Sequence, residues 1–171
     1  MTKEVGWEEP GILIGQLRVH KVRGFTYLYA EQQHVHETKV GDYRLGLHRK
    51  VESAYQELHG NAEKPPMLVM YINVPEQDRM YHMQAGYMVA PGTPAVGEAK
   101  VRDIPATLVA SIVTCCDSHS IWKSYAPLME FMNQNGLQPL DEGWREHSLY
   151  FEGPDSQNNI TWVQHVAKET D

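Results

Sequence analysis

The sequence predicts an α+β fold in which two similar halves join their strands into one largely antiparallel sheet, with two helices on one face. Two observations carry this prediction. Short β-branched and aromatic segments alternate with two stretches of helical periodicity, so that the order strand, strand, helix, strand, strand occurs twice. Features also recur at a spacing of about eighty residues, as Gly60 and Gly136 do after the two helices and Tyr71 and Tyr150 do on strands.

The first half covers residues 11–90. A β-branched and aromatic segment is interrupted at Arg23-Gly24, which predicts two strands with a tight turn or bulge between them. Apolar residues three or four apart then predict an amphipathic helix that stops at Gly60. The expected elements are two strands within 17–33, a helix over 40–59, and strands at 67–73 and 80–89.

The second half covers residues 98–168 and follows a joint rich in proline and glycine. Its helical stretch contains Pro127, which removes a backbone hydrogen bond inside a helix. The helix is therefore either kinked or begins near Ser124. The expected elements are strands at 100–104 and 107–114, a helix within 119–135, and strands at 144–151 and 159–166.

The composition is that of one globular domain spanning residues 1–171, with 42% hydrophobic and 22% charged residues. A formal net charge of −7, with no cluster of Lys or Arg, argues against nucleic acid as a direct partner and favours neutral or cationic small molecules. The start of the chain has no apolar signal-peptide core, and no run of about eighteen apolar residues occurs anywhere. We therefore expect a cytoplasmic protein that does not bind membranes.

The two cysteines, Cys115 and Cys116, are adjacent. They are too close for an ordinary disulfide and do not form a CxxC site, so reduced, buried thiols are expected. With His119 they could instead form a Cys–His nucleophile near the start of the second helix, although burial as small hydrophobic residues is the commoner role. Motifs for phosphate loops, dinucleotide binding and serine hydrolases are missing from the sequence.

The nine histidines raise the hypothesis of a metal site. His34 and His36 share a strand face, and His147 and His165 could be neighbours if their strands pair. No third ligand stands at a usable spacing, so we expect no metal and no cofactor. Solvated or singly hydrogen-bonded histidines are the simpler interpretation.

One strand places a carboxylate beside aromatic rings. Alternation puts Trp144, Glu146, Ser148 and Tyr150 on the same face. A desolvated Glu146 among rings would bind a cationic or polarised ligand through its charge and through cation–π contacts, or act as a general base. On periodicity alone, a Glu on a solvated strand face is the more common situation.

The same combination recurs elsewhere in the chain. Tyr27, Tyr29 and Glu31 share a face of an early strand, and Trp162 lies on the last strand. Packing explains most aromatic stripes of this kind. Both a ligand pocket and ordinary packing remain open for these residues.

An ordered set of segments resembles the GyrI-like small-molecule-binding domain, which also serves as the effector-binding domain of multidrug-responsive transcription regulators. The resemblance extends from about Leu17 to Val166 and is carried by the set and not by one motif. The segments are GYMVAPG at 86–92, VRDIPA at 101–106, YAPL at 125–128 with NGLQP at 135–139, and WREHSL at 144–149.

The resemblance implies duplicated β-α-β-β repeats with a ligand cleft along the pseudo-dyad between them. In that family a Glu lies at the base of an aromatic pocket, and Glu146 is the matching residue. Ser148 stands where the family often has a Tyr, and residues 117–120 replace a common Gly-x-Tyr, so the ligand itself is not carried over. The expected ligand-binding residues are Glu146, Trp144, Tyr150, Trp162, Tyr27, Tyr29, Tyr71, Tyr125 and His119.

For function, the resemblance implies a stand-alone binding protein for aromatic, drug-like small molecules that are cationic or neutral, without the DNA-binding module of the regulators. The alternative is a hydrolase that opens a cyclopropane-bearing compound, with Glu146 as its catalytic residue, because residues 158–165 resemble a hydrolytic branch of the family. A third possibility is a protein-interacting member such as a gyrase-directed inhibitor, which would need a large exposed patch and an occluded cleft.

Overall fold

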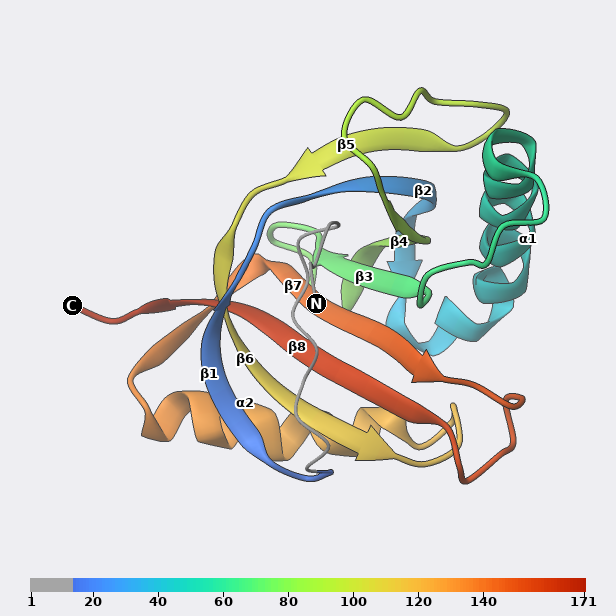
Figure 1. The fold of residues 1–171 in the computed structure, drawn as a ribbon. Helices are drawn as coiled ribbons and strands as arrows, with labels where there is room; N and C mark the ends of the chain where they lie inside the picture. The colour runs from blue at the N-terminus through green and yellow to red at the C-terminus, as the bar shows by residue number, and fades with distance from the viewer. Residues whose placement is uncertain (1–13) are drawn as a thin grey trace.

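A curved, eight-stranded antiparallel sheet forms the centre of the protein in a computed structural model, which describes residues 14–171 (Figure 1). The strand order is β1-β6-β8-β7-β3-β4-β2-β5. The strands are β1 (Leu17–Val22), β2 (Phe25–His36), β3 (Leu68–Asn73), β4 (Met80–Val89), β5 (Lys100–Ile104), β6 (Thr107–Cys115), β7 (Leu137–Tyr150) and β8 (Ile160–Glu169), and the helices are α1 (Val40–His59) and α2 (Tyr125–Gln134). The predicted α+β fold class is confirmed.

The two halves exchange their first strands. β1 pairs with β6 of the second half, and β5 pairs with β2 of the first half. The strand order therefore reads the same when the halves are interchanged, with the pseudo-dyad between β3 and β7. The two connections cross at Gly24, where a Cβ atom would lie 2.9 Å from the carbonyl oxygen of Ile104 (Figure 1). A crossover thus replaces the tight turn or bulge that was predicted here, and only glycine allows so close an approach.

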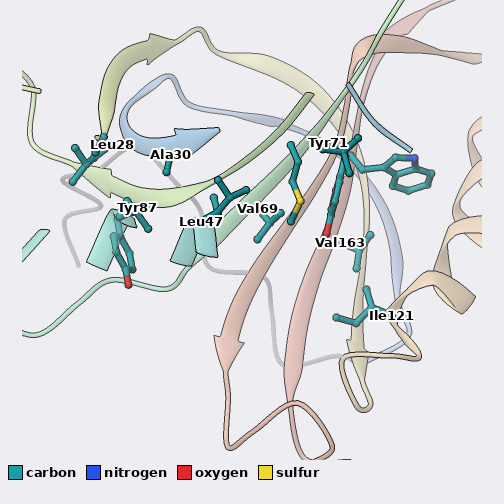
Figure 2. Close-up of a cluster of buried hydrophobic side chains, with 14 of the residues drawn as sticks. Leu28, Ala30, Leu47, Val69, Tyr71, Tyr87, Ile121 and Val163 are labelled. Atoms are coloured by element: carbon teal, nitrogen blue, oxygen red, sulfur yellow. The ribbon is translucent and has the colours of Figure 1, made fainter. Parts of the chain in front are cut away.

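Both helices cover the same face of the sheet, as predicted. α1 packs on β2 and β4, and α2 packs on β6 and β7. Their buried residues, which include Leu47 of α1 and Leu128 of α2, join one hydrophobic cluster with the inward-facing side chains of the strands. Figure 2 shows Val69 of β3 and Val163 of β8 in this cluster. No helix within residues 14–171 has the length and apolar character to cross a bilayer.

Several strand ends differ from the prediction, most of all the start of β7, and the start of α2 decides between the two alternatives given for that helix. α2 begins at Tyr125, after a 3-10 turn at Ile121–Ser124, so Pro127 falls in the first helical turn, where its missing N–H leaves no hydrogen bond unmade. This agrees with a start near Ser124.

β7 begins at Leu137 instead of Trp144 because a bulge before Trp144 lets the strand continue. Gly143 occupies the bulge with a φ of 69°, and a Cβ atom there would lie 2.1 Å from the carbonyl oxygen of Tyr71.

Candidate functional site

The candidate site lies where the two halves meet, at the junction of β3 and β7. In the antiparallel register Tyr71 is opposite Trp144, and Val69 is opposite Glu146. Side chains of directly opposed residues lie on the same face of a sheet, and Val69 belongs to the cluster beneath the helices. Tyr71, Trp144 and Glu146 therefore all project toward α1 and α2, and each is at most 7% exposed.

The Glu146 carboxylate connects the two helices. The Tyr125 hydroxyl, on α2, donates a hydrogen bond to Oε1 of Glu146. Nη2 of Arg44, on α1, lies 3.6 Å from Oε2 of Glu146 and also donates to the hydroxyl of Tyr71 at 2.6 Å. A carboxylate from the sheet is thereby held by one group from each half of the molecule.

The two phenols of this cluster stay protonated at neutral pH. Burial raises the pKa of Tyr125 well above its usual value, and the negative charge of Glu146 adds to the effect. The same two causes raise the pKa of Tyr71. Because both hydroxyls remain neutral, the cluster contains one anion, Glu146, and one cation, Arg44, which compensate each other.

Aromatic rings form one wall of the site. The ring of Tyr125 stacks on Trp144 with centroids 4.0 Å apart and an angle of 10° between the planes. Trp144 also contacts the ring of His165, with centroids 4.4 Å apart and planes at 81° to each other. Nδ1 of His165 lies 2.8 Å from the carbonyl oxygen of Val166, and burial lowers the pKa of this imidazole, so it stays neutral near pH 7. The wall therefore presents flat, uncharged rings next to the carboxylate.

The Arg44 side chain provides the connection between this cluster and solvent. It is 28% exposed, whereas the Glu146 side chain is 7% exposed. A group that replaced the guanidinium would reach a desolvated carboxylate flanked by rings. Such an arrangement selects a cation by charge and by cation–π contact, and the carboxylate could equally accept a proton from a bound water.

Four of the predicted site residues come together here: Glu146, Trp144, Tyr71 and Tyr125. Three others, Trp162, Tyr29 and Tyr27, lie on the opposite face of the sheet, because strand alternation and register direct their side chains there. Trp162 is opposite His147, the residue next to Glu146 on β7. Tyr29 is opposite Gly86, which in turn is opposite Leu68, a neighbour of Val69.

Tyr27, two residues from Tyr29 on β2, shares that opposite face and donates its hydroxyl to the carbonyl oxygen of Leu68 at 2.6 Å. The last two predicted residues, Tyr150 and His119, are exposed. Tyr150 donates to Glu152 at the end of β7, and His119 lies 3.3 Å from Asp155. None of these five residues contacts Glu146.

Arg44 is the site residue that was not predicted. Because Arg44 is charged, the apolar spacing that predicted the buried face of this helix did not include it and included Tyr43 instead. Tyr43 is 41% exposed, whereas Arg44 stands three residues before Leu47 and four after Val40, on the buried side of α1. Helical spacing applied to charged as well as apolar residues would have placed Arg44 beneath the helix.

The histidine pairs considered for a metal do not assemble into a metal site. Within residues 14–171 no group of three His, Cys, Asp or Glu side chains is arranged to hold a metal ion. Although β7 and β8 pair, His147 is opposite Trp162 and His165 is opposite Trp144, so the two imidazoles point to opposite faces. His34 stacks edge-on against His82, and Nδ1 of His36 lies 2.8 Å from the hydroxyl of Thr38.

Both thiols are reduced, as expected, but burial is wrong for Cys115 and only partial for Cys116. Cys115 is exposed at the end of β6, and Cys116 is partly buried, with both thiols free. The Cys115 Sγ lies 3.3 Å from the carbonyl oxygen of Gln157, and the imidazole of His119 is engaged with Asp155 instead of a thiol. The geometry gives no support to a Cys–His nucleophile.

The sequence matches no protein-family model, and no curated protein matches it significantly. Solved structures do match over most of the chain. The crystal structure of the EcmrR C-terminal domain has a TM-score of 0.71 at 13% identity, covering 92% of this chain and 100% of that domain.

Two further solved structures extend the comparison. A hydrolase from Listeria innocua encoded by lin2189 has a TM-score of 0.62 at 9% identity, covering 92% of this chain and 94% of that one. SAV2435 bound to tetraphenylphosphonium has a TM-score of 0.62 at 11% identity, covering 90% of this chain and 94% of that one. Likenesses at such low identity establish the fold alone, and the chain has the fold of the EcmrR C-terminal domain.

Proposed function

We propose that this protein binds aromatic small molecules, cationic or neutral, at the Glu146 site. The observation that carries the proposal is the Glu146 side chain, only 7% exposed, whose carboxylate lies beside the stacked rings of Trp144 and Tyr125 at the junction of the two halves. A buried anion beside flat rings is suited to a delocalised or quaternary cation, which costs little to dehydrate and gains from both charge and ring faces. Tetraphenylphosphonium, which SAV2435 binds, has this chemistry.

Arg44 sets the mode of binding in this proposal. Its guanidinium already compensates Glu146, so an incoming cation must take its place. The Arg44 side chain can move into solvent, since it is 28% exposed and its long stem reaches from the buried side of α1 to the surface. Ligand affinity is then the difference between the ligand's contacts and those of Arg44, and a neutral ligand would rely on ring contacts alone.

The test is calorimetry with tetraphenylphosphonium and, as its neutral counterpart, triphenylphosphine oxide. Glu146→Gln preserves size and removes the charge, so phosphonium affinity should fall by about 1–3 kcal/mol while phosphine oxide affinity changes little. Glu31→Gln is the matched control, because Glu31 lies on the other face of the sheet and pairs with Lys100 at 2.7 Å. Equal phosphonium affinity in wild type and Glu146→Gln would refute the proposal.

The second candidate is hydrolysis of an electrophilic cyclopropane in the same site. It is favoured by the contact between Glu146 and a neutral Tyr125, which pairs a base with a proton donor. Glu146 would take a proton from water as the water oxygen attacks a ring carbon. The electron pair of the broken carbon–carbon bond would pass to a conjugated carbonyl, whose oxygen takes a proton from Tyr125.

Mass spectrometry separates the two candidates. A cyclopropyl ketone incubated with the protein returns intact from a binder and with one water added from a hydrolase. In the second case Glu146→Gln should retain substrate binding and lose roughly two to four orders of magnitude in turnover. A substrate that returns intact under saturating conditions excludes the hydrolase.

A further inference from the structure

We propose a second binding site on the helix-free face of the sheet, where Arg102 and Arg145 together bind the oxyanion of a small molecule, a carboxylate or a phosphate group. Arg145 precedes Glu146 on β7 and therefore projects to the opposite face. Arg102 lies on β5, opposite Tyr27 of β2, and shares that face. The site is thus separated by the sheet from the cluster around Glu146.

The two guanidinium groups lie close together above aromatic rings. Arg102 is 5.4 Å from the ring centroid of Tyr29, and Arg145 is 5.8 Å from that of Phe25. Burial, and next to it the positive charge of Arg102, lowers the pKa of Arg145 to about 10. Both guanidinium groups carry a positive charge, so each raises the free-energy cost of burying the other.

No carboxylate within residues 14–171 lies at ion-pair distance from either arginine. Arg145 is nevertheless only 2% exposed, and neither its buried Nε nor that of Arg102 has a hydrogen-bond partner in the part of the chain that the structure describes. Arg102 does donate to Oε1 of Gln84 at 2.6 Å. Glu31, which accepts from Gln84 at 3.1 Å, is engaged by Lys100.

Among residues 14–171, the one carboxylate that raises the pKa of Arg145 is Glu142, and it lies beyond ion-pair distance. Burial raises the pKa of Tyr27 well above its usual value, so this phenol is neutral. Burial lowers the pKa of His147 on the same face to about 3, so this imidazole is neutral as well. Buried charges in proteins are normally paired, and the planar forks of two guanidinium groups match the oxygens of a carboxylate or phosphate. A bound oxyanion would therefore compensate the buried charge of the two arginines and accept their N–H groups.

The opposite charge makes the two sites separable by experiment. Benzamidine, benzamide and benzoate share a ring and shape and differ in carrying a positive, zero or negative charge. Titrated into the full chain by calorimetry, benzoate and inorganic phosphate should bind, and benzamide should bind at least about tenfold more weakly than benzoate. Benzamidine should not compete with benzoate, because it would be repelled by the arginine pair.

Substitution of either arginine tests the assignment. Arg145→Gln and Arg102→Gln should each weaken benzoate binding about tenfold or more and leave tetraphenylphosphonium binding unchanged. Arg49→Gln, at an exposed position of α1, is the matched control and should change neither. If the wild-type protein binds benzoate but not tetraphenylphosphonium, the proposed function is refuted and this inference stands.

Two results would overturn the proposal. One is equal binding of benzoate and benzamide to the wild-type protein. The other is benzoate affinity that survives Arg102→Gln, a variant at a partly exposed position on a strand at the edge of the sheet, which keeps the test decisive if Arg145→Gln does not fold.

Discussion

Two consecutive residues of β7 carry opposite charges to opposite faces of the sheet, and the two faces treat those charges differently. On the helix face Glu146 is met by Arg44 from α1 and by Tyr125 from α2. On the helix-free face Arg145 is equally buried but meets a second cation, Arg102, and aromatic rings. The helices supply the groups that contact Glu146, whereas within residues 14–171 no carboxylate lies at ion-pair distance from Arg145 or Arg102.

The comparison indicates how one sheet can present two kinds of site. Alternation along a strand fixes which side chain goes to which face, and the elements packed on each face then decide whether its charge is satisfied. A compensated charge is available only to a ligand that displaces its partner. An uncompensated charge favours any counter-ion that reaches it.

The largest expected difference between the two faces is in how their buried histidines make the free energy of unfolding depend on pH. His147 lies on the arginine face with its pKa lowered by burial from 6.5 to about 3, so below pH 6.5 the unfolded chain binds a proton that the folded protein does not. Stability from this residue is therefore full above pH 6.5 and lost as the pH falls toward 3, by about 3 kcal/mol between pH 7 and 4.

Urea denaturation at a series of pH values checks this expectation. His147→Gln should flatten the acid limb of the stability profile by that amount. His165→Gln, the matched change on the helix face, should flatten it less, because burial lowers the pKa of His165 by a smaller margin. Equal slopes in wild type and His147→Gln would show that His147 is protonated in the folded protein.

Neutralising the charges of β7 should have opposite consequences for the free energy of unfolding. Glu146→Gln leaves Arg44 without its counter-ion and should destabilise the protein by about 1–3 kcal/mol. Arg145→Met removes a buried charge that has no ion-pair partner among residues 14–171 and keeps the apolar stem, so stability should rise or change by less than about 1 kcal/mol. Chemical denaturation measures both. If Arg145→Met were the more damaging change, the arginine would have a compensating partner and the contrast between the faces would fail.

Removing Arg44 should strengthen cation binding at the Glu146 site. Arg44→Met retains most of the apolar stem that covers the site but deletes the internal cation, so tetraphenylphosphonium should bind about tenfold more tightly. Lys50→Met, at an exposed position of α1 paired with Glu98, is the control and should have no effect. Weaker phosphonium binding in Arg44→Met would mean that Arg44 contributes to ligand binding instead of competing with it.

Much of the fold could be predicted because periodicity is local. The alternation at 80–89 and the helical spacing at 40–59 gave β4 and α1 with their observed bounds. The exchange of β1 and β5 between halves could not be predicted, since it depends on which distant strand each one meets. The bulge at Gly143 was missed for a related reason, because the need for glycine arises from the carbonyl of Tyr71 on another strand.

The site was predictable only along single strands. Alternation correctly placed Trp144 and Glu146 on one face, whereas the grouping of Tyr27, Tyr29 and Trp162 with them required the register between strands, which sequence does not specify. Arg44 was missed because its role depends on contact with β7, not on its own element. The face of a strand on which a side chain lies can be predicted from sequence, whereas the side chains of other elements that it contacts cannot.

The most direct test of the central claim is a crystal structure of the protein with tetraphenylphosphonium. We expect the phosphonium between α1 and α2, with its phenyl groups against Trp144 and Tyr125 and Arg44 withdrawn beyond ion-pair distance from Glu146. A phosphonium on the helix-free face, or at any position with the Arg44–Glu146 pair intact, would contradict the account.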